Sequence, residues 1–250
     1  MFKNFQYIIY YLIKPKLRYH FFLICKRKII NLFLIFKKND LDEYKISRIN
    51  DIYKYLNIYN IDNPKILFKD IFDQRIKVVN TNPYNFGGEA DLELLFNISK
   101  HQGINNILET GVANGWSSLA ILLAINNDRY KKLTSIDLPY PYKDSESFIG
   151  KAVPDNLKEN WNLIIDNDKK ILSKFHSQEI KFDFVHYDSD KSYDGRIKSY
   201  NLIWNILQPG GILMSDDVSD NNAFIFFCSS KNLKPLIYEF EGKQIGIIKK

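Results

Sequence analysis

The stretch Ile107-Leu-Glu-Thr-Gly-Val-Ala-Asn-Gly-Trp-Ser117 decides the fold of this 250-residue chain. A short run at 106–109, with Ile107 and Leu108 as its apolar residues, leads into a Gly-x-x-x-Gly turn, and a longer, mostly apolar run at 117–126 follows the turn. The lengths of the two runs are typical of a buried strand and a helix. Where a strand passes into a helix in an α/β sheet, glycines such as Gly111 and Gly115 let the backbone approach a ligand closely. The stretch therefore predicts a strand, a ligand-binding turn and a helix.

The same alternation of strand and helix continues along the chain. Further strands are predicted at 132–137, 161–165, 182–187 and 211–215, and helices at 89–100, 168–175 and 195–207. Short apolar strands separated by helices are typical of a parallel sheet with helices on both faces. Two last strands, 236–240 and 244–248, flank Glu241-Gly242-Lys243 and predict an antiparallel hairpin. The expected fold is an α/β domain with a doubly wound, mostly parallel sheet of seven strands.

Residues 1–80 are expected to form a helical extension in front of the α/β domain, which would occupy residues 81–250. Apolar and charged residues alternate at helical spacing over 40–58 and 63–76, which predicts two helices that cover the body. Turn-forming residues crowd the stretch 80–88. We therefore expect a loop there that acts as a domain boundary and a hinge.

The positive charge of the chain lies almost entirely in its first forty residues. The whole sequence carries a net charge of +6, but residues 1–40 alone carry +8 and the remaining residues carry −2. A nucleic-acid-binding domain has its positive charge on the folded body that contacts phosphates, so this distribution argues against a nucleic-acid partner. Two cysteines, Cys25 and Cys228, without a Cys-x-x-Cys motif, favour a reducing compartment. We expect a cytoplasmic protein.

Residues 1–40 have two interpretations. Their apolar runs are shorter than the roughly 20 residues of a membrane-spanning helix, and no signal-peptide cleavage pattern follows the first run. A basic, aromatic-rich helix lying on the inner face of a membrane is one interpretation. The other, which we favour, is a pair of helices packed on the body or on a second subunit of a homo-oligomer, because apolar residues surround most of the helical wheel.

Asp137, at the end of the predicted strand 132–137, is a second candidate binding residue. A carboxylate at that place can accept hydrogen bonds from both hydroxyls of a ribose. Combined with the glycine turn, it predicts a nucleoside site. The turn lacks the Gly-x-Gly-x-x-Gly pattern, which argues against a nicotinamide dehydrogenase.

These residues resemble the cofactor site of the class I S-adenosylmethionine-dependent methyltransferases. Two further blocks, Phe182-Asp-Phe-Val-His-Tyr-Asp-Ser-Asp-Lys-Ser-Tyr-Asp-Gly195 and Leu207-Gln-Pro-Gly-Gly-Ile-Leu-Met-Ser-Asp-Asp-Val218, are similar to the caffeoyl-CoA-type and macrolide-sugar-type O-methyltransferases. The resemblance covers about residues 85–250. It implies S-adenosyl-L-methionine as the cofactor and a hydroxyl of a small molecule or a sugar as the methyl acceptor.

The resemblance also implies roles for single residues. Glu109 and Gly111 would contact the methionine part of the cofactor, Asp137 the ribose, and Asp168 the adenine side. The implied cofactor site as a whole comprises Glu109, Gly111, Ala113, Gly115, Ser117, Asp137 and Asp168.

In metal-dependent relatives, acids at the positions of Asp188, Asp216 and Asp217 bind a divalent ion. Three carboxylates at adjacent strand ends repel one another unless a cation or protons intervene, and oxygen ligands suit Mg²⁺ better than zinc. The alternative is that some of these acids cap helices or bind the side chain of Lys191. That alternative leaves a metal-independent methyltransferase, or a non-catalytic S-adenosylmethionine-binding protein, open.

Asp188 and Lys191 are the candidate catalytic residues. A lysine base would need its pKa lowered toward neutrality, whereas neighbouring carboxylates raise it, so we expect Lys191 to be a charge partner first. His186 lies inside a predicted strand, which is more typical of a core histidine. Residues 138–156, with Tyr140, Tyr142 and Phe148, form either an acceptor pocket and lid or a solvent-exposed loop.

Overall fold

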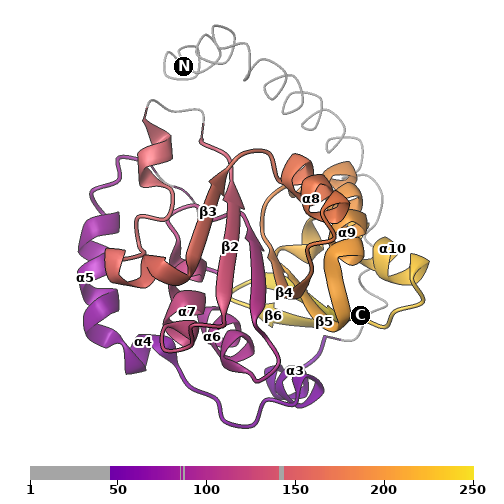
Figure 1. Ribbon diagram of the computed structural model, residues 1–250. Helices are drawn as coiled ribbons and strands as arrows, with labels where there is room; N and C mark the ends of the chain where they lie inside the picture. The colour runs from indigo at the N-terminus through magenta and orange to yellow at the C-terminus, as the bar shows by residue number, and fades with distance from the viewer. Residues whose placement is uncertain (1–45, 85, 87, 141–143) are drawn as a thin grey trace, which may run out of the picture.

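The computed structural model describes residues 46–84, 86, 88–140 and 144–250 (Figure 1). The helices are α3 (Ile49–Leu56), α4 (Pro64–Leu67), α5 (Lys69–Val79), α6 (Leu92–Lys100), α7 (Trp116–Ile125), α8 (Asp168–Ser177), α9 (Tyr193–Ile206) and α10 (Ala223–Ser230). The strands are β1 (Asn106–Thr110), β2 (Lys132–Asp137), β3 (Trp161–Ile165), β4 (Phe182–Tyr187), β5 (Leu207–Ser215), β6 (Leu236–Phe240) and β7 (Lys243–Lys249). Short 3-10 helices lie at Ser145–Phe148, Asp155–Asn160 and Val218–Asp220.

The strands form one sheet with the order β3-β2-β1-β4-β5-β7-β6. β1 pairs in parallel with β2 and with β4, and the pairs β2–β3 and β4–β5 are also parallel. β7 is antiparallel to both β5 and β6. The strand order reverses between β1 and β4, and in such a sheet the carboxyl ends at the reversal frame a crevice for a ligand. The predicted fold class and the predicted hairpin are confirmed.

Helices cover both faces of the sheet (Figure 1). One apolar core lies against α3, α5, α6 and α7 and includes Leu94 and Leu119. The second core lies against α8, α9 and α10 and includes Tyr200 and Phe224. All four side chains are fully buried. Strands covered on both faces are rich in apolar residues. The centres of β1, β4 and β5 accordingly carry the buried runs Ile107-Leu108, Phe184-Val185 and Ile212-Leu213-Met214.

Four strands, β2, β3, β4 and β6, have the bounds that the sequence predicts. The predicted helix at 40–58 differs: α3 begins only at Ile49, and Ile46 forms a parallel bridge with Ile237 of β6. The predicted helix at 63–76 is divided at Phe68 into α4 and α5. α6 begins three residues later than predicted because Asp91 caps it, with Oδ1 accepting a hydrogen bond from the Leu94 amide.

The helices before residue 80 pack on the α/β domain. Ile52 of α3 and Phe72 of α5 belong to the same apolar core as α6 and α7. Arg75 of α5 donates hydrogen bonds from Nε to the carbonyl of Ala152, at 3.0 Å, and from Nη2 to that of Lys151, at 2.5 Å. α5 therefore supports the loop beside the glycine turn, and the division of the chain at residue 80 stays a prediction.

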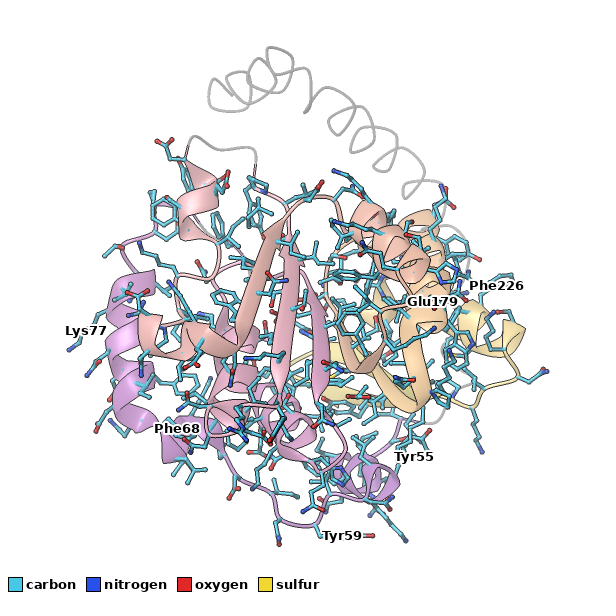
Figure 2. All side chains as sticks on the ribbon, in the orientation of Figure 1. Tyr55, Tyr59, Phe68, Lys77, Glu179 and Phe226 are labelled. Atoms are coloured by element: carbon cyan, nitrogen blue, oxygen red, sulfur yellow. The ribbon has the colours of Figure 1, made fainter. Side chains whose placement is uncertain are left out.

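Large exposed apolar side chains stand at separate places on the surface, as Figure 2 shows for Tyr59 and Phe226. Isolated apolar side chains of this kind are common on protein surfaces. Within the described ranges, each helix is too short or too polar to cross a bilayer. The segment 1–40, for which the sequence suggests a membrane contact, lies outside the described residues, and so does Tyr142.

Candidate active site

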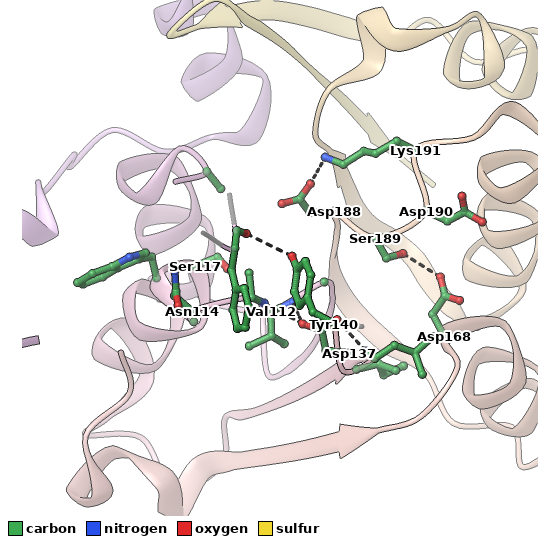
Figure 3. Close-up of a pocket in the computed structure, with 18 of the residues that line it drawn as sticks. Val112, Asn114, Ser117, Asp137, Tyr140, Asp168, Asp188, Ser189, Asp190 and Lys191 are labelled. Carbon is green, nitrogen blue, oxygen red and sulfur yellow. Dashed lines mark hydrogen bonds and ion pairs between the residues drawn. The ribbon is translucent and has the colours of Figure 1, made fainter. Parts of the chain in front are cut away.

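A cavity of about 510 Å³ opens at the carboxyl ends of β1, β2 and β4 (Figure 3). The glycine turn after β1 forms one wall, and the segments after β2, β3 and β4 form the others. The cavity therefore lies where the reversal of strand order places it. Its lining includes most of the predicted binding residues, namely Gly111, Ala113, Gly115, Ser117, Asp137, Asp168, Asp188, Lys191 and Asp217.

Two glycines let the turn after β1 lie close to neighbouring backbone. Gly111 and Gly115 have φ angles of +85° and +88°, a region that favours glycine. A Cβ on Gly111 would lie 2.3 Å from the carbonyl oxygen of Asp188, and a Cβ on Gly115 would lie 2.7 Å from Cα of Gly150. The glycines are therefore required by the fold of the cavity wall itself, before any ligand is considered.

Asp137 joins two walls of the cavity. Its Oδ2 accepts hydrogen bonds from the backbone amides of Val112, at 2.9 Å, and Ala113, at 2.8 Å. Its Oδ1 accepts one from the amide of Leu138, at 2.7 Å. Burial raises the pKa of Asp137, although these three amides oppose the shift. Carboxylate oxygens can each accept more than one hydrogen bond, so the side chain can hold the turn and still receive a ligand hydroxyl.

Asp168, at the start of α8, connects the segment after β3 to the segment after β4. Its Oδ2 accepts a hydrogen bond from Oγ of Ser189, at 2.8 Å (Figure 3). The next residue, Lys169, places its Nζ 2.7 Å from Oδ2 of Asp190. Both pairs lie on the cavity wall. The predicted adenine side is thus a polar wall that side chains from two strand ends hold in place.

Glu109 does not line the cavity, although the sequence predicts a contact with the cofactor. Its carboxylate is fully buried, and Oε2 accepts hydrogen bonds from the hydroxyls of Ser118 on α7 and Ser135 on β2. The side chain therefore lies among α7, β2 and β4, beneath the cavity. The sequence shows that Glu109 is near a strand end, but only the fold shows which way the side chain turns.

His186 is a buried partner of two carboxylates. Its Nδ1 lies 3.7 Å from Oε1 of Glu109, and its Nε2 lies 3.4 Å from Oδ1 of Asp216. Burial opposes protonation of the imidazole, but these two carboxylates outweigh it and raise the pKa of His186 to about 10. The same contact lowers the pKa of Asp216 against the opposing effect of burial. His186 is therefore a core histidine, as its position in the strand suggests, and its two carboxylate neighbours favour the charged form of the imidazole.

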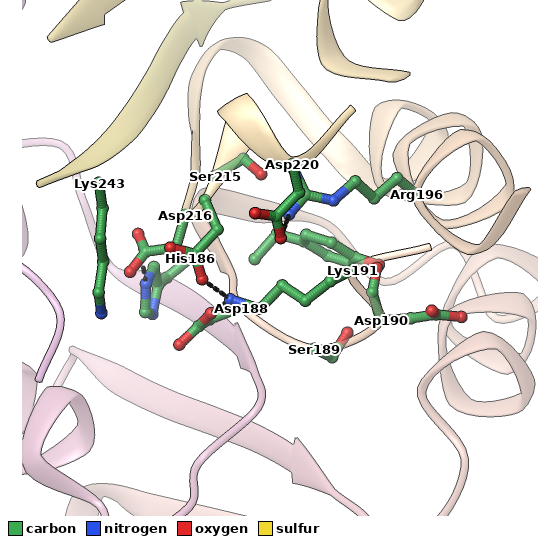
Figure 4. Close-up of polar contacts among 12 residues, drawn as sticks. His186, Asp188, Ser189, Asp190, Lys191, Arg196, Ser215, Asp216, Asp220 and Lys243 are labelled. Atoms are coloured by element: carbon green, nitrogen blue, oxygen red, sulfur yellow. Dashed lines mark hydrogen bonds and ion pairs between the residues drawn. The ribbon is translucent and has the colours of Figure 1, made fainter. Parts of the chain in front are cut away.

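The acids predicted to hold Mg²⁺ have basic side chains of the protein beside them (Figure 4). Lys191 extends its Nζ to Oδ1 of Asp188 and to Oδ2 of Asp217. Burial lowers the pKa of Lys191, but the two carboxylates outweigh it and raise the pKa. Asp216 is 1% exposed, faces His186 and is not part of the cavity wall.

This arrangement does not fit a divalent cation. The three carboxylates do not surround a common space, because the ammonium of Lys191 lies between two of them and the third turns inward to His186. Among the residues that the structure describes, no group of three acidic, histidine or cysteine side chains is placed to hold a metal. The contacts are those of the alternative that the sequence left open, in which Lys191 binds the acids.

Aromatic side chains cover one side of the cavity. The rings of Phe86 and Tyr140 stack with centroids 4.2 Å apart, and the Tyr140 hydroxyl donates a hydrogen bond to the carbonyl of Phe86 at 3.2 Å. Tyr84 stacks on Phe86 at 6.2 Å and meets Phe148 edge-on. Tyr140 and Phe148 were candidates from the sequence, whereas Tyr84 and Phe86 lie in a stretch that its turn formers marked only as a loop.

Lys243, in the C-terminal hairpin, is a cavity residue that sequence reasoning missed. It lines the cavity, and its Nζ donates a hydrogen bond to the carbonyl of Glu89 at 3.2 Å. Its positive charge also contributes to the lowered pKa of Asp216. Nothing in the hairpin sequence points to a site, because Lys243 reaches the cavity only through the antiparallel addition of β7 to the sheet.

Part of the chain is similar in sequence to known methyltransferases. A family model described as a methyltransferase domain matches residues 108–218, from β1 to the turn after β5. The chain is 32% identical over 134 residues to "Probable caffeoyl-CoA O-methyltransferase 3" of Dictyostelium discoideum, which covers 52% of this chain and 51% of the relative. The match thus spans about half the length of that curated relative.

Solved methyltransferase structures have a similar fold. The O-methyltransferase from Bacillus cereus in complex with SAH has a TM-score of 0.59 and 15% identity, over 80% of this chain and 97% of that chain. The SAH-bound methyltransferase from Podospora anserina has a TM-score of 0.58 and 13% identity, over 83% of this chain and 99% of that chain. At such identities the likeness shows the fold. Residues 108–218 thus match a methyltransferase domain, the chain has the fold of these methyltransferase structures, and about half of it is similar in sequence to a probable caffeoyl-CoA O-methyltransferase.

Proposed function

We propose that this domain transfers a methyl group from S-adenosyl-L-methionine to a hydroxyl oxygen of a small molecule or a sugar. The observation that carries the proposal is the layout of the cavity described above. The glycine turn, Asp137 and Asp168 line one part of it, and Asp188, Lys191 and Asp217 line another. A nucleoside-binding wall thus faces a charged group that can receive an acceptor.

The chain's own residues account for cofactor binding. Asp137 offers carboxylate oxygens to the ribose hydroxyls, and Asp168 lies on the wall assigned to the adenine side. The turn from Gly111 to Ser117 lets backbone amides approach the methionine part. When bound, the cofactor supplies an electrophilic methyl group on a sulfonium.

On the acceptor side, Lys191 and Asp188 have complementary tasks. The ammonium of Lys191 donates a hydrogen bond to the acceptor oxygen and stabilises negative charge that develops on it. The carboxylate of Asp188, whose pKa burial and the charge of Asp216 raise, lies next to the same ammonium and accepts the hydroxyl proton. The remaining contribution is proximity, because the cavity walls hold both reactants in one orientation.

A Mg²⁺ ion held by Asp188, Asp216 and Asp217, as the family resemblance implies, would require the pairs with Lys191 and His186 to separate. The metal-independent alternative needs no such change. The contacts of Lys191 with Asp188 and Asp217 favour that alternative.

Calorimetric titration followed by turnover tests the proposal. We expect S-adenosylmethionine and S-adenosylhomocysteine to bind to the full chain, and NAD not to bind. Release of S-adenosylhomocysteine is then measured with a panel of hydroxylated small molecules and sugars, with and without a chelator. Tight binding of the cofactor without release in the presence of any acceptor would instead support a non-catalytic binding protein, and binding of NAD alone would contradict the proposal outright.

A further inference from the structure

Two of the three carboxylates at the acceptor side pair with a lysine, and the third faces a buried histidine. Lys191 contacts both Asp188 and Asp217, and His186 lies 3.4 Å from Asp216. The side chains of Lys191, Asp188 and Asp217 are 35%, 30% and 24% exposed and line the cavity, whereas Asp216 is buried. The positive charge facing the cavity at this point is therefore an ammonium.

The backbone around Lys191 is tied down, so this placement does not depend on the side chain alone. Asn221 donates a hydrogen bond from Nδ2 to the carbonyl of Lys191, at 2.9 Å. The hydroxyl of Tyr187 donates one to the carbonyl of Asp190, at 2.8 Å. A divalent cation would have to take the same carboxylate oxygens that Lys191 holds, and the two positive charges would repel each other.

We propose that the ammonium of Lys191 takes the place of a divalent cation in this site, so that methyl transfer proceeds without a metal. The proposal rests on the proposed function. The acceptor oxygen forms a bond to the methyl carbon while the carbon–sulfur bond breaks and leaves its electron pair on sulfur. The hydroxyl proton passes to Asp188 and then to solvent, and Lys191 keeps its own protons throughout.

Metal binding tests the proposal without any measurement of turnover. Mn²⁺ is titrated into the chelator-treated full chain, and free Mn²⁺ is followed by its electron paramagnetic resonance signal. We expect no binding to the wild type up to millimolar Mn²⁺, and at least tenfold tighter binding to Lys191→Met, because that variant leaves Asp188 and Asp217 without a cation. Lys191→Arg keeps the charge and should behave like the wild type.

A double variant locates the gained site. Lys191→Met combined with Asp188→Asn should lose the Mn²⁺ binding that Lys191→Met gains, and circular dichroism confirms that each variant is folded. Micromolar Mn²⁺ binding by the wild type, or no gain in Lys191→Met, would overturn the proposal. If the wild type methylates an acceptor, full activity in the presence of a chelator is expected and its loss would also overturn the proposal. If no acceptor is methylated, the proposed function fails, while the Mn²⁺ comparison still decides whether Lys191 excludes the metal.

Discussion

Asp137 acts on the cavity in two ways at the level of a single residue. It holds the amides of Val112 and Ala113 in the glycine turn, and it presents carboxylate oxygens to the cavity. A change of this side chain therefore alters both the shape of the wall and the group that meets the ligand. The two effects act in the same direction on cofactor affinity.

We predict that Asp137→Asn weakens binding of S-adenosylhomocysteine at least tenfold. Hydrogen bonds to a charged group contribute about 1.5–3 kcal/mol, and each 1.4 kcal/mol corresponds to about a factor of ten in affinity. Isothermal titration calorimetry measures the change. Asp128→Asn is a matched control, because Asp128 lies in a surface turn where Oδ1 accepts a hydrogen bond from Tyr130. Equal affinity of the two variants would contradict a role for Asp137.

The limits of sequence reasoning are clearest at Glu109 and His186. The sequence places Glu109 near a strand end and His186 within a strand, and both placements are correct. It does not show that the two residues lie opposite each other in the pairing of β1 with β4. That register arises only when the sheet forms, so the sequence predicts one cofactor ligand and one core histidine where the structure has a buried acid–imidazole pair.

At the scale of elements, the glycine turn after β1 can form only because Gly111 leaves room for the backbone of Asp188. Gly111 lies against Asp188, whereas Gly103, with a φ of +87°, has nothing within 4 Å of the position of its missing Cβ. The two glycines share a left-handed backbone but differ in the space around them. Alanine at Gly103 therefore introduces backbone strain alone, whereas alanine at Gly111 introduces the same strain and a steric clash.

We predict that Gly103→Ala costs about 1–2 kcal/mol of stability, the usual cost of a left-handed L-residue, and leaves cofactor affinity unchanged. Gly111→Ala adds a steric clash to that strain, so we expect a larger loss of stability and at least a tenfold loss of affinity for S-adenosylhomocysteine. Urea unfolding and calorimetry measure the two quantities. The outcome that would contradict the prediction is a Gly111→Ala variant with the affinity of the wild type.

The C-terminus of α6 is capped by a side chain from the turn before β2. Nζ of Lys131 donates hydrogen bonds to the carbonyls of Ser99, Lys100 and His101, at 2.9, 3.2 and 2.9 Å. The side chain is 7% exposed, so water cannot easily replace it. A cation at this end also interacts favourably with the helix dipole.

We predict that Lys131→Met lowers the free energy of unfolding by about 1–3 kcal/mol, because buried carbonyls lose their donor. Lys77→Met is the control, since Lys77 lies on the exposed face of α5 (Figure 2). Urea denaturation of both variants measures the difference. Similar midpoints for the two variants would show that the cap contributes little.

The elements that the sequence missed have a physical explanation. α10 is apolar on nearly all sides, so its sequence has no helical period to detect. The division between α4 and α5 at Phe68 and the extended residues before α3 depend on packing against the domain. The sequence alone locates the ends of β2 and β4, because turn-forming or charged residues flank both strands.

On the scale of the whole molecule, both apolar cores are formed by residues within 46–250. α3 and α5 pack on the domain, and Arg75 of α5 supports Lys151 and Ala152. The amide of Ala152 in turn donates a hydrogen bond to the carbonyl of Asn114 in the glycine turn, at 2.8 Å. α5 is thus connected to the cavity wall by two successive sets of hydrogen bonds, from Arg75 to residues 151–152 and from Ala152 to Asn114.

We predict that a fragment of residues 46–250 unfolds cooperatively and binds S-adenosylhomocysteine with the affinity of the full chain. Both apolar cores and the cavity lining lie within that range. Denaturation and calorimetry compare the fragment with the full chain. An insoluble fragment, or one with lost affinity, would contradict the prediction.

The same two proteins test the membrane interpretation of residues 1–40. If the +8 charge of this segment contacts an anionic surface, the full chain floats with phosphatidylserine vesicles and residues 46–250 do not. Flotation should then decrease at high salt, which screens such attraction. Identical behaviour of the two proteins would leave only the interpretation that the segment packs on protein.

The stacking of Trp116 on Phe72, with ring centroids 6.0 Å apart, has an optical consequence. Trp116 lines the cavity, whereas Trp204 of α9 packs against Phe227 in the core on the other face of the sheet. A molecule that enters the cavity changes the surroundings of the first indole and leaves those of the second unchanged. The third tryptophan, Trp161, donates a hydrogen bond from Nε1 to Oγ of Ser135 and does not line the cavity. The fluorescence of Trp116 therefore follows occupancy of the cavity, whereas that of Trp161 and Trp204 follows loss of the fold.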